Sequence, residues 1–354
     1  MLAAQVGAAA ELSGNGLHWE KLAALPNPAG LGSPYAGVSD GKLLVAGGAN
    51  FPQAPPWAGG KKRWYDTVYA LPDPQGRWQE VGKLIRPMGY GVSATAPGGV
   101  VCAGGSDLAR HYRDVFLLRF AAGSLETKVL PPLPRPMANG CGAVLDNVLY
   151  IAGGIEEPNS TNTLRTFWAL DLAAATPAWR ESEPWPGPGR MLAVAAAQDG
   201  AFYLISGTSL SGDAEGKPVR RYLTDAYSFR PGSGWKQLAD IPRPAVAAPS
   251  PAPVLDSRIV VLSGDDGTRL GFQPPDQHPG FAKDVLAYHT LSNTWTKLGE
   301  VPCTQVTAPA VAWRGRHVVP NGEIRPGVRT PEVWSFSVSN PPANPPAAGK
   351  SYSR

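Results

Sequence analysis

The chain has 354 residues, of which only 17% are charged, and it contains 41 Gly and 38 Pro. This composition favours many short strands joined by tight turns and argues against a fold built on long helices. The net charge of +4 comes without any run of Lys and Arg, so we expect no nucleic acid partner. No stretch approaches the ~20 apolar residues of a membrane span, so we expect no membrane partner either.

The chain begins with an alanine-rich stretch over residues 1–10 that lacks a basic region and a strong apolar core. It therefore provides no clear signal peptide. We expect residues 1–16 to form a flexible N-terminal segment. The first predicted strand follows at residues 18–22, His-Trp-Glu-Lys-Leu.

An apolar run that ends in a pair of small residues then recurs six times along the chain. The first residue of each pair falls at position 47, 104, 153, 206, 263 and 321, so the intervals are 57, 49, 53, 57 and 58 residues. This spacing is close to the ~50-residue period of kelch repeats. After each pair come a loop, a strand rich in aromatic or branched residues and, in most copies, a strand that carries a tryptophan. The pattern predicts an all-β, six-bladed kelch-type β-propeller with four strands, a to d, in each blade.

One repeat is divided between the two ends of the chain. The N-terminal strand is of the d type, whereas residues from about 308 to 338 supply strands of the a, b and c types. We therefore expect the last blade to be closed by the N-terminal d strand, which leaves no free sheet edge. Residues 17–339 form a single propeller in this interpretation. Residues 340–354, which are rich in Pro and Ala, read as a disordered tail.

The order of strands predicts which face of the propeller carries a site. In an a-b-c-d blade the b–c and d–a loops emerge on the same face. The b–c loops are long, and long loops on a rigid scaffold are where binding sites concentrate. The same face should receive arginines from the d–a loops, and we expect it to carry a local positive potential near the axis. These arginines are Arg86, Arg135, Arg190 and Arg243.

The b–c loop of the divided blade departs from the others. Residues 321–330 read Asn-Gly-Glu-Ile-Arg-Pro-Gly-Val-Arg-Thr, where five other copies have Gly-Gly or Ser-Gly at the small pair. A carboxylate followed by two arginines has two interpretations. One is a solvated loop with a local ion pair. The other is a catalytic carboxylate beside a guanidinium that binds a substrate carboxylate in two places.

This loop resembles the signature loop of the N-acetylneuraminate epimerase family, the bacterial sialic acid mutarotases built as six-bladed kelch propellers. Other segments are also similar: residues 46–49 (Ala-Gly-Gly-Ala), residues 60–62 (Gly-Lys-Lys) and residues 89–93 (Gly-Tyr-Gly-Val-Ser). In that family the Asn-Gly-Glu loop lies mid-chain and the Gly-Gly-Ala segment follows it. Here the loop is near the C-terminus, so the chain looks like a cyclically permuted member. The family would also imply a periplasmic location.

The resemblance implies an isomerase that interconverts the α and β forms of N-acetylneuraminate or a related acidic sugar by acid/base ring opening, with no metal or organic cofactor. By this match Glu323 is the base and Arg329 contacts the substrate carboxylate. Further substrate-binding candidates are Asn321, Arg325, Asn50, Lys61, Lys62, Tyr90 and Arg86. For the two lysines a solvated loop, and for Tyr90 core packing, are the competing interpretations. Asp107, Glu156 and Asp266 in related loops could supply a second carboxylate, although surface solvation is the simpler expectation.

Three other functions stay open. A non-catalytic kelch module could bind a glycan or a protein on the same face, because fold alone does not decide function. A galactose-oxidase-like copper enzyme would need clustered His and Tyr ligands. The five histidines are scattered, and the three cysteines (Cys102, Cys141, Cys303) read as buried free thiols. A mutarotase could also act on a different sugar.

Overall fold

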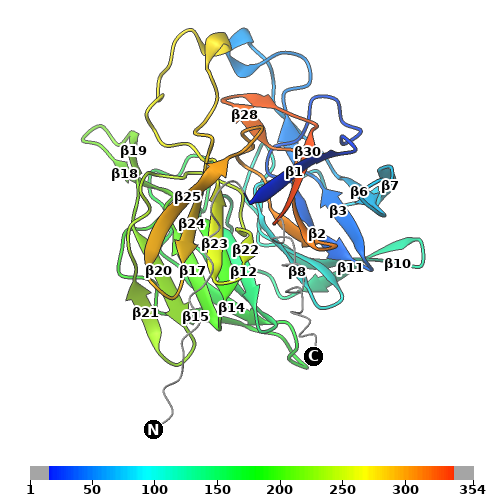
Figure 1. Cartoon of the computed structure of the whole chain (residues 1–354), viewed down its shortest axis with the longest axis horizontal. Helices are drawn as coiled ribbons and strands as arrows, with labels where there is room; N and C mark the ends of the chain where they lie inside the picture. The colour runs from blue at the N-terminus through cyan, green and yellow to red at the C-terminus, as the bar shows by residue number, and fades with distance from the viewer. Residues whose placement is uncertain (1–15, 339–354) are drawn as a thin grey trace, which may run out of the picture.

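Six antiparallel four-stranded sheets surround a central axis in the computed structural model, which describes residues 16–338 (Figure 1). The predicted six-bladed propeller is confirmed. The predicted flexible N-terminal segment, apart from Gly16, and the predicted tail lie outside the described residues, so those boundaries stay predictions.

Each blade runs from an inner a strand to an outer d strand. The a strands are β2 (Tyr35–Ser39), β8 (Val92–Ala96), β12 (Cys141–Leu145), β16 (Val194–Gln198), β22 (Val254–Leu255) and β26 (Val311–Trp313). The b strands are β3 (Lys42–Ala46), β9 (Gly99–Ala103), β13 (Val148–Ala152), β17 (Ala201–Ile205), β23 (Arg258–Leu262) and β27 (Arg316–Pro320). The c strands are β6 (Thr67–Leu71), β10 (Val115–Ala121), β14 (Phe167–Asp171), β20 (Ala226–Arg230), β24 (Asp284–His289) and β30 (Val333–Val338). The d strands are β7 (Gln79–Lys83), β11 (Ser124–Leu130), β15 (Trp179–Ser182), β21 (Gly234–Gln237), β25 (Thr294–Glu300) and β1 (Leu17–Leu22).

The apolar runs of the sequence form the b strands because neighbouring blades cover both of their faces. Every residue of β9 and β17 is buried, whereas most of the outer strand β11 is exposed. The core lies between blades: Val101 and Val115 of one blade pack in the same cluster as Ile151 and Trp168 of the next. Continuous apolar runs of this length are therefore buried strands here.

Four of the recurring tryptophans each join their own blade to the one before it. The indole N–H of Trp78 donates to the carbonyl of Ala23 at 2.8 Å, and three further tryptophans repeat the contact. They are Trp179 to Pro131, Trp235 to Glu183 and Trp295 to Ala239. Each aromatic ring thus packs its apolar body between blades while its polar edge is satisfied.

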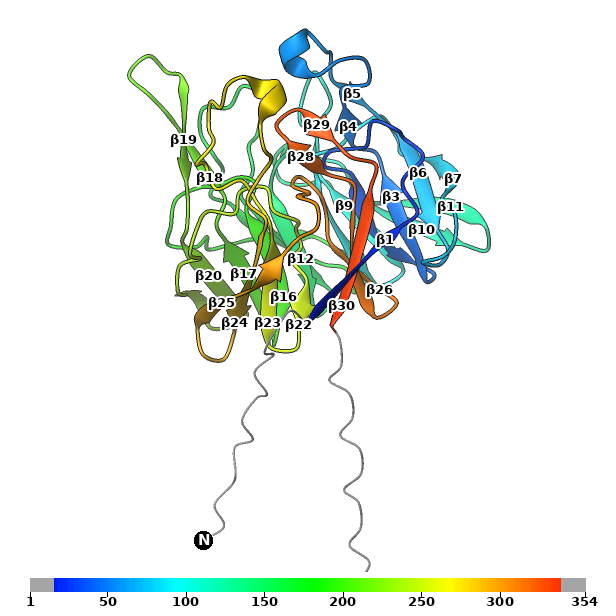
Figure 2. The ribbon, with the colours of Figure 1, turned by 45° about the horizontal axis from the view of Figure 1, so that its top comes forward.

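The first and last described strands close the ring. β1 pairs antiparallel with β30 from Leu17 opposite Val338 to Leu22 opposite Val333, as the divided repeat predicts (Figure 2). Trp19 and Phe336 pack across this pair with ring centroids 4.7 Å apart.

The small pairs turn the chain out of each b strand into its b–c loop. Both residues of every pair have positive φ, from Gly47 (65°) and Gly48 (88°) to Asn321 (63°) and Gly322 (116°). Glycine adopts this conformation at no steric cost, and Asn tolerates it better than most other residues. The b–c loops carry three short hairpins, which project on one face (Figure 2). They are β4 (Ala49–Asn50) with β5 (Arg63–Trp64), β18 (Thr208–Gly212) with β19 (Pro218–Tyr222), and β28 (Glu323–Arg325) with β29 (Val328–Arg329).

A closed circle of backbone hydrogen bonds surrounds the axis on this face. In each blade the d–a loop supplies one residue of positive φ whose N–H donates to the carbonyl of the corresponding residue in the preceding blade. The six donor–acceptor pairs are Ser33 to Thr307, Tyr90 to Ser33, Asn139 to Tyr90, Leu192 to Asn139, Ala247 to Leu192 and Thr307 to Ala247, at 2.6 to 3.0 Å. The circle sets the positions of the side chains around the mouth of the central channel.

Candidate functional site

A cavity of about 390 Å³ lies on the face of the b–c loops, where the fourth, fifth and sixth blades meet. Pockets that bind small molecules usually measure about 300–1,000 Å³. Both apolar and ionisable side chains line it. The ionisable residues are Arg220, Tyr222, Asp265, Arg269, His278 and Glu323.

Glu323 enters the cavity from the start of β28. Its backbone N–H and carbonyl pair with those of Val306 at 2.8 and 3.0 Å, which fixes the residue beside the channel. The side-chain Oε1 accepts a 2.6 Å hydrogen bond from the N–H of Gly327, in the turn of the same hairpin. Only 14% of the Glu323 side chain is exposed, so its carboxylate is fixed in position at the cavity wall and is not a solvated surface group.

Arg329 lies directly opposite Glu323 in the β28–β29 register. Its Nη2 is 3.1 Å from Glu323 Oε2, and only 5% of its side chain is exposed. The guanidinium also packs over the ring of Phe51, 5.0 Å from its centroid. Nε and Nη1 have no hydrogen-bond partner among the described residues. Buried guanidinium donors are costly to leave unpaired, so these two groups are available to a ligand or to water.

Tyr90 connects Arg329 to a second cation. Its hydroxyl accepts a 2.8 Å hydrogen bond from Lys62 Nζ and lies 3.4 Å from Arg329 Nη2. Lys62 is also surrounded by the rings of Phe51, Trp64 and Tyr90, at 5.7, 5.4 and 4.5 Å from their centroids. The sequence leaves two interpretations of Tyr90, substrate binding and core packing. The structure places this residue at the channel mouth, where it belongs to the circle of backbone hydrogen bonds.

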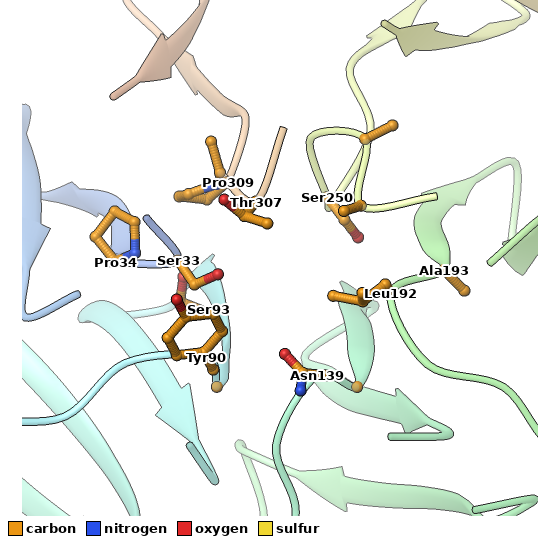
Figure 3. A pocket seen from close by; sticks show the side chains of 15 residues that line it. Ser33, Pro34, Tyr90, Ser93, Asn139, Leu192, Ala193, Ser250, Thr307 and Pro309 are labelled. Atoms are coloured by element: carbon orange, nitrogen blue, oxygen red, sulfur yellow. The ribbon is translucent and has the colours of Figure 1, made fainter. Parts of the chain in front are cut away.

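The channel mouth itself is a small hollow of about 60 Å³, with Ser33, Tyr90 and Thr307 on one side (Figure 3). Thr307 lines this hollow and the larger cavity, and its Oγ1 has no partner among the described residues. Gly32 lies next to it. A Cβ at Gly32 would be 3.0 Å from Arg329 Nε and 3.4 Å from Thr307 Oγ1. Arg329 Nε and Thr307 Oγ1, both without a partner among the described residues, therefore lie close to the space that a side chain at Gly32 would fill.

The remaining predicted residues are distributed differently. Asn50 is fully buried and its amide is occupied: it donates to Asn27 and to the Gly30 carbonyl, and accepts from the Tyr65 hydroxyl. Asn321 is buried at the base of the β28–β29 hairpin, and its amide has no partner among the described residues. Arg325 donates to the backbone carbonyl of Asp276, in the 3₁₀ turn η2 (Pro275–Gln277), and so holds two b–c loops together. Lys61 is exposed.

Arg86 does not join this group. Its Nη1 is 2.9 Å from Asp114 Oδ2, and its guanidinium packs 4.6 Å from the ring centroid of Tyr112. The other three d–a arginines are also paired: Arg190 with Asp225, Arg243 with Asp284 and Arg135 with Glu156. The positive charge expected from these four arginines is therefore offset locally. Arg329 and Lys62 are the predicted cations that lie together.

Asp265 is a cavity residue that the sequence interpretation passed over in favour of its neighbour Asp266. Asp265 Oδ2 accepts a 2.7 Å hydrogen bond from the Tyr222 hydroxyl. Burial, and then this bond, raise the pKa of Tyr222 far above its usual range, so the phenol keeps its proton. Asp266 instead bonds Thr268 and lines a different hollow. The signal was present in the repeat: Asp265, like Glu323, directly follows the small pair.

His278 also lines the cavity, and its Nδ1 accepts a 3.1 Å hydrogen bond from the N–H of Gly280. Burial, together with the charge of Arg269, lowers the pKa of His278, which favours the neutral ring with its proton on Nε2.

The cysteines are remote from this chemistry. Cys102 and Cys141 are buried as predicted, Cys303 is half-buried, and all three are free thiols. Burial raises the pKa of Cys141 to about 12 and that of Cys303 to about 11.

Between residues 16 and 338, no three His, Cys, Asp or Glu residues gather as metal ligands. No helix in that range has the length and apolar character needed to span a bilayer.

Comparison with known proteins gives one consistent result. Residues 2–127 match the family model of N-acetylneuraminate epimerase. The chain is 27% identical over 229 residues to an N-acetylneuraminate epimerase of Yersinia enterocolitica, covering 58% of this chain and 56% of that protein. It is 27% identical over 235 residues to one of Haemophilus influenzae (59% and 60%) and 30% identical over 231 residues to one of Yersinia pestis (58% and 56%).

These matches leave part of each protein uncovered. The chain spans somewhat more than half the length of the relatives it matches. The loop with Glu323 and Arg329 lies outside the residues that match the family model. Within the residues covered, the matches confirm the resemblance and relate this chain to the N-acetylneuraminate epimerase family.

Proposed function

We propose that this protein is a mutarotase that interconverts the α and β anomers of N-acetylneuraminate or a related acidic sugar. The observation that carries the proposal is the contact between Arg329 and Glu323, whose side chain lines a ligand-sized cavity. In such a sugar the anomeric carbon bears both a hydroxyl and a carboxylate. A base for the hydroxyl and a cation for the carboxylate must therefore be neighbours, as these two side chains are.

Ring opening needs a group that takes the proton from the anomeric hydroxyl and a group that protonates the ring oxygen. Glu323 has the first role in this proposal, because its carboxylate is paired with Arg329 and faces the cavity. Positioned proton transfer contributes about 10²–10⁴-fold, which suits a reaction that also proceeds slowly in water.

The carboxylate of the substrate would lie toward the channel mouth. There Arg329 offers Nε and Nη1, Thr307 offers its hydroxyl, and Lys62 adds a second positive charge behind Tyr90. A guanidinium donates hydrogen bonds in fixed directions, so it orients a carboxylate as well as attracting it. The sugar ring would then occupy the cavity beside Glu323. The names of the relatives agree with this substrate class.

The test is the rate at which anomers equilibrate. The α anomer of N-acetylneuraminate is released freshly by a sialidase, and its conversion is followed by proton NMR with and without the protein. We expect equilibration to be faster with the protein, and glucose, which has no carboxylate, to be unaffected. Equal rates with and without the protein, over all acidic sugars tried, would contradict the proposal and favour a module that only binds.

A further inference from the structure

Asp265 and Glu323 occupy the same position in adjacent blades. Each directly follows the small pair of its b–c loop, and each forms the same double backbone hydrogen bond with a d–a residue: Asp265 with Val246, and Glu323 with Val306. The corresponding residues of the other blades are Ala49, Ser106, Ile155 and Thr208. The repeat thus presents two carboxylates at equivalent points on neighbouring blades.

Both carboxylates line the cavity of about 390 Å³, and Val246, Ala247, Val306 and Thr307 form the wall between them. Asp265 is held in place by the Tyr222 hydroxyl on Oδ2 and by the N–H of Gly267 on Oδ1, at 2.7 and 3.0 Å. Its environment differs from that of Glu323 in one respect. Within the described residues Asp265 forms no ion pair, whereas Glu323 is paired with Arg329.

We propose that Asp265 is the second proton-transfer residue of the site, acting at the ring oxygen while Glu323 acts at the anomeric hydroxyl. The inference rests on the proposed mutarotase function and identifies a second acid/base residue for it. Pairs of carboxyl groups in different environments commonly divide acid and base roles in this way. Glu323 is the partner of Arg329, which in this proposal binds the carboxylate on the anomeric carbon, so Glu323 is placed at the anomeric hydroxyl and Asp265 at the ring oxygen.

The proton balance closes with these two residues alone. On opening, the anomeric hydroxyl gives its proton to Glu323, the bond from the anomeric carbon to the ring oxygen breaks, and the ring oxygen takes the proton of Asp265. A keto group and a free hydroxyl result. After rotation about the adjoining carbon–carbon bond, that hydroxyl attacks the other face of the keto carbon and returns its proton to Asp265. The keto oxygen takes the proton back from Glu323, so the site regains its starting state.

The experiment compares Asp265→Asn with Asp266→Asn, whose carboxylate lies next in the chain but outside the cavity. Anomer equilibration of N-acetylneuraminate is measured by NMR from pH 5 to pH 9, and binding by calorimetry. Arg220, Tyr222, Arg269, His278 and Glu323 also face the cavity, so the whole profile is compared between variants. We expect Asp265→Asn to lower turnover by about 10²-fold, with binding changed only a few-fold, and to alter the pH profile of turnover.

Asp266→Asn should behave as the wild type, and Asp265→Glu, which keeps a carboxyl group, should recover part of the lost turnover. If Asp265→Asn does not fold, Asp265→Glu and Tyr222→Phe carry the test through their altered pH profiles. An active wild type together with an Asp265→Asn variant of near-normal rate and unchanged pH profile overturns this inference alone. A wild type that does not accelerate the reaction overturns the proposed function as well.

Discussion

Glu323 and Arg329 are cross-strand partners in a hairpin of only a few residues, and their Oε2 and Nη2 atoms are 3.1 Å apart. The turn that joins them contains Gly327, whose φ of 79° suits glycine and whose N–H binds the second oxygen of Glu323. The hairpin thereby fixes both oxygens of the carboxylate with groups from its own backbone and opposite strand. Because the contact is local, a substitution there should alter the site without disturbing the propeller.

The first prediction concerns Glu323→Gln. The amide keeps the shape of the side chain but cannot accept the proton, so turnover should fall by about 10²-fold or more with little change in binding. NMR of anomer equilibration measures the first quantity and calorimetry the second. Glu156→Gln is the matched control, because Glu156 lies in another b–c loop, paired loosely with Arg135 at 3.8 Å. A Glu323→Gln variant with a near-normal rate would remove Glu323 from the base role.

The second prediction concerns Arg329→Lys. An ammonium keeps the charge but cannot contact Glu323, Tyr90 and a substrate carboxylate at once. Hydrogen bonds to charged groups contribute about 1.5–3 kcal/mol, so we expect binding of N-acetylneuraminate to weaken about 10- to 100-fold and turnover to fall as well. Arg325→Lys is the control, since Arg325 bonds a backbone carbonyl of η2 instead. Unchanged binding in Arg329→Lys would exclude the guanidinium from substrate recognition.

The third prediction uses the space above Gly32. A methyl group there would approach Arg329 Nε to 3.0 Å and Thr307 Oγ1 to 3.4 Å, and would fill the point to which both polar groups are directed. We expect Gly32→Ala to weaken binding of the acidic sugar about tenfold while the protein stays folded. In the control Gly212→Ala the new methyl group meets no atom closer than 3.7 Å. Normal binding by Gly32→Ala would argue against a carboxylate site at the channel mouth.

The repeat explains why so much of the fold could be predicted from the sequence. The six small pairs, the tryptophans and the divided blade all depend on local patterns that recur with a fixed phase. The pairing of β1 with β30, at opposite ends of the chain, could be predicted from the position of each strand within the repeat.

Site residues were harder to predict because their contacts depend on how loops from different blades meet. The sequence predicts that Arg86 binds substrate, whereas in the structure Arg86 pairs with Asp114, the residue directly before a c strand. The sequence held a hint of this pairing. The fourth and fifth blades repeat the same combination of a d–a arginine and an aspartate at the c strand, in Arg190 with Asp225 and Arg243 with Asp284. Asp265 is difficult to identify for a related reason. Its equivalence to Glu323 is visible when the six repeats are aligned on their small pairs, and it is not visible when each loop is considered alone.

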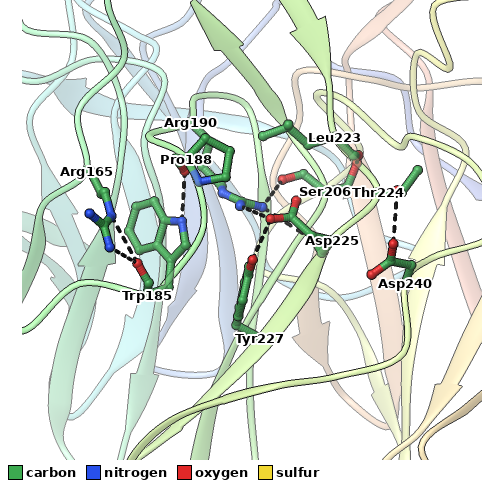
Figure 4. A network of polar contacts seen from close by, with 10 residues as sticks. All are labelled: Arg165, Trp185, Pro188, Arg190, Ser206, Leu223, Thr224, Asp225, Tyr227 and Asp240. Atoms are coloured by element: carbon green, nitrogen blue, oxygen red, sulfur yellow. Dashed lines mark hydrogen bonds and ion pairs between the residues drawn. The ribbon is translucent and has the colours of Figure 1, made fainter.

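The last prediction tests the structural role of these arginine–aspartate pairs. The side chain of Arg190 is fully buried, with Nη2 2.6 Å from Asp225 Oδ2 and Nη1 bonded to the Ser206 carbonyl (Figure 4). Tyr227 donates to the same carboxylate oxygen at 2.8 Å. Removing one partner of a buried pair leaves the other charge uncompensated, which typically costs 3–5 kcal/mol. Because 18% of the Asp225 side chain is exposed, we expect Asp225→Asn to lower the free energy of unfolding by about 3 kcal/mol.

Denaturant unfolding measures this loss, and Asp256→Asn is its control. Asp256 pairs with Arg258 at 3.2 Å, but 83% of its side chain is exposed, so its removal should cost at most about 1 kcal/mol. A second measurement follows Tyr227, whose pKa is raised to about 12 by burial and by its bond to Asp225. In Asp225→Asn the pKa of Tyr227 should fall, since the phenolate would no longer face a carboxylate. Equal stability losses in the two variants would mean that Arg190 does not depend on Asp225 for its compensation.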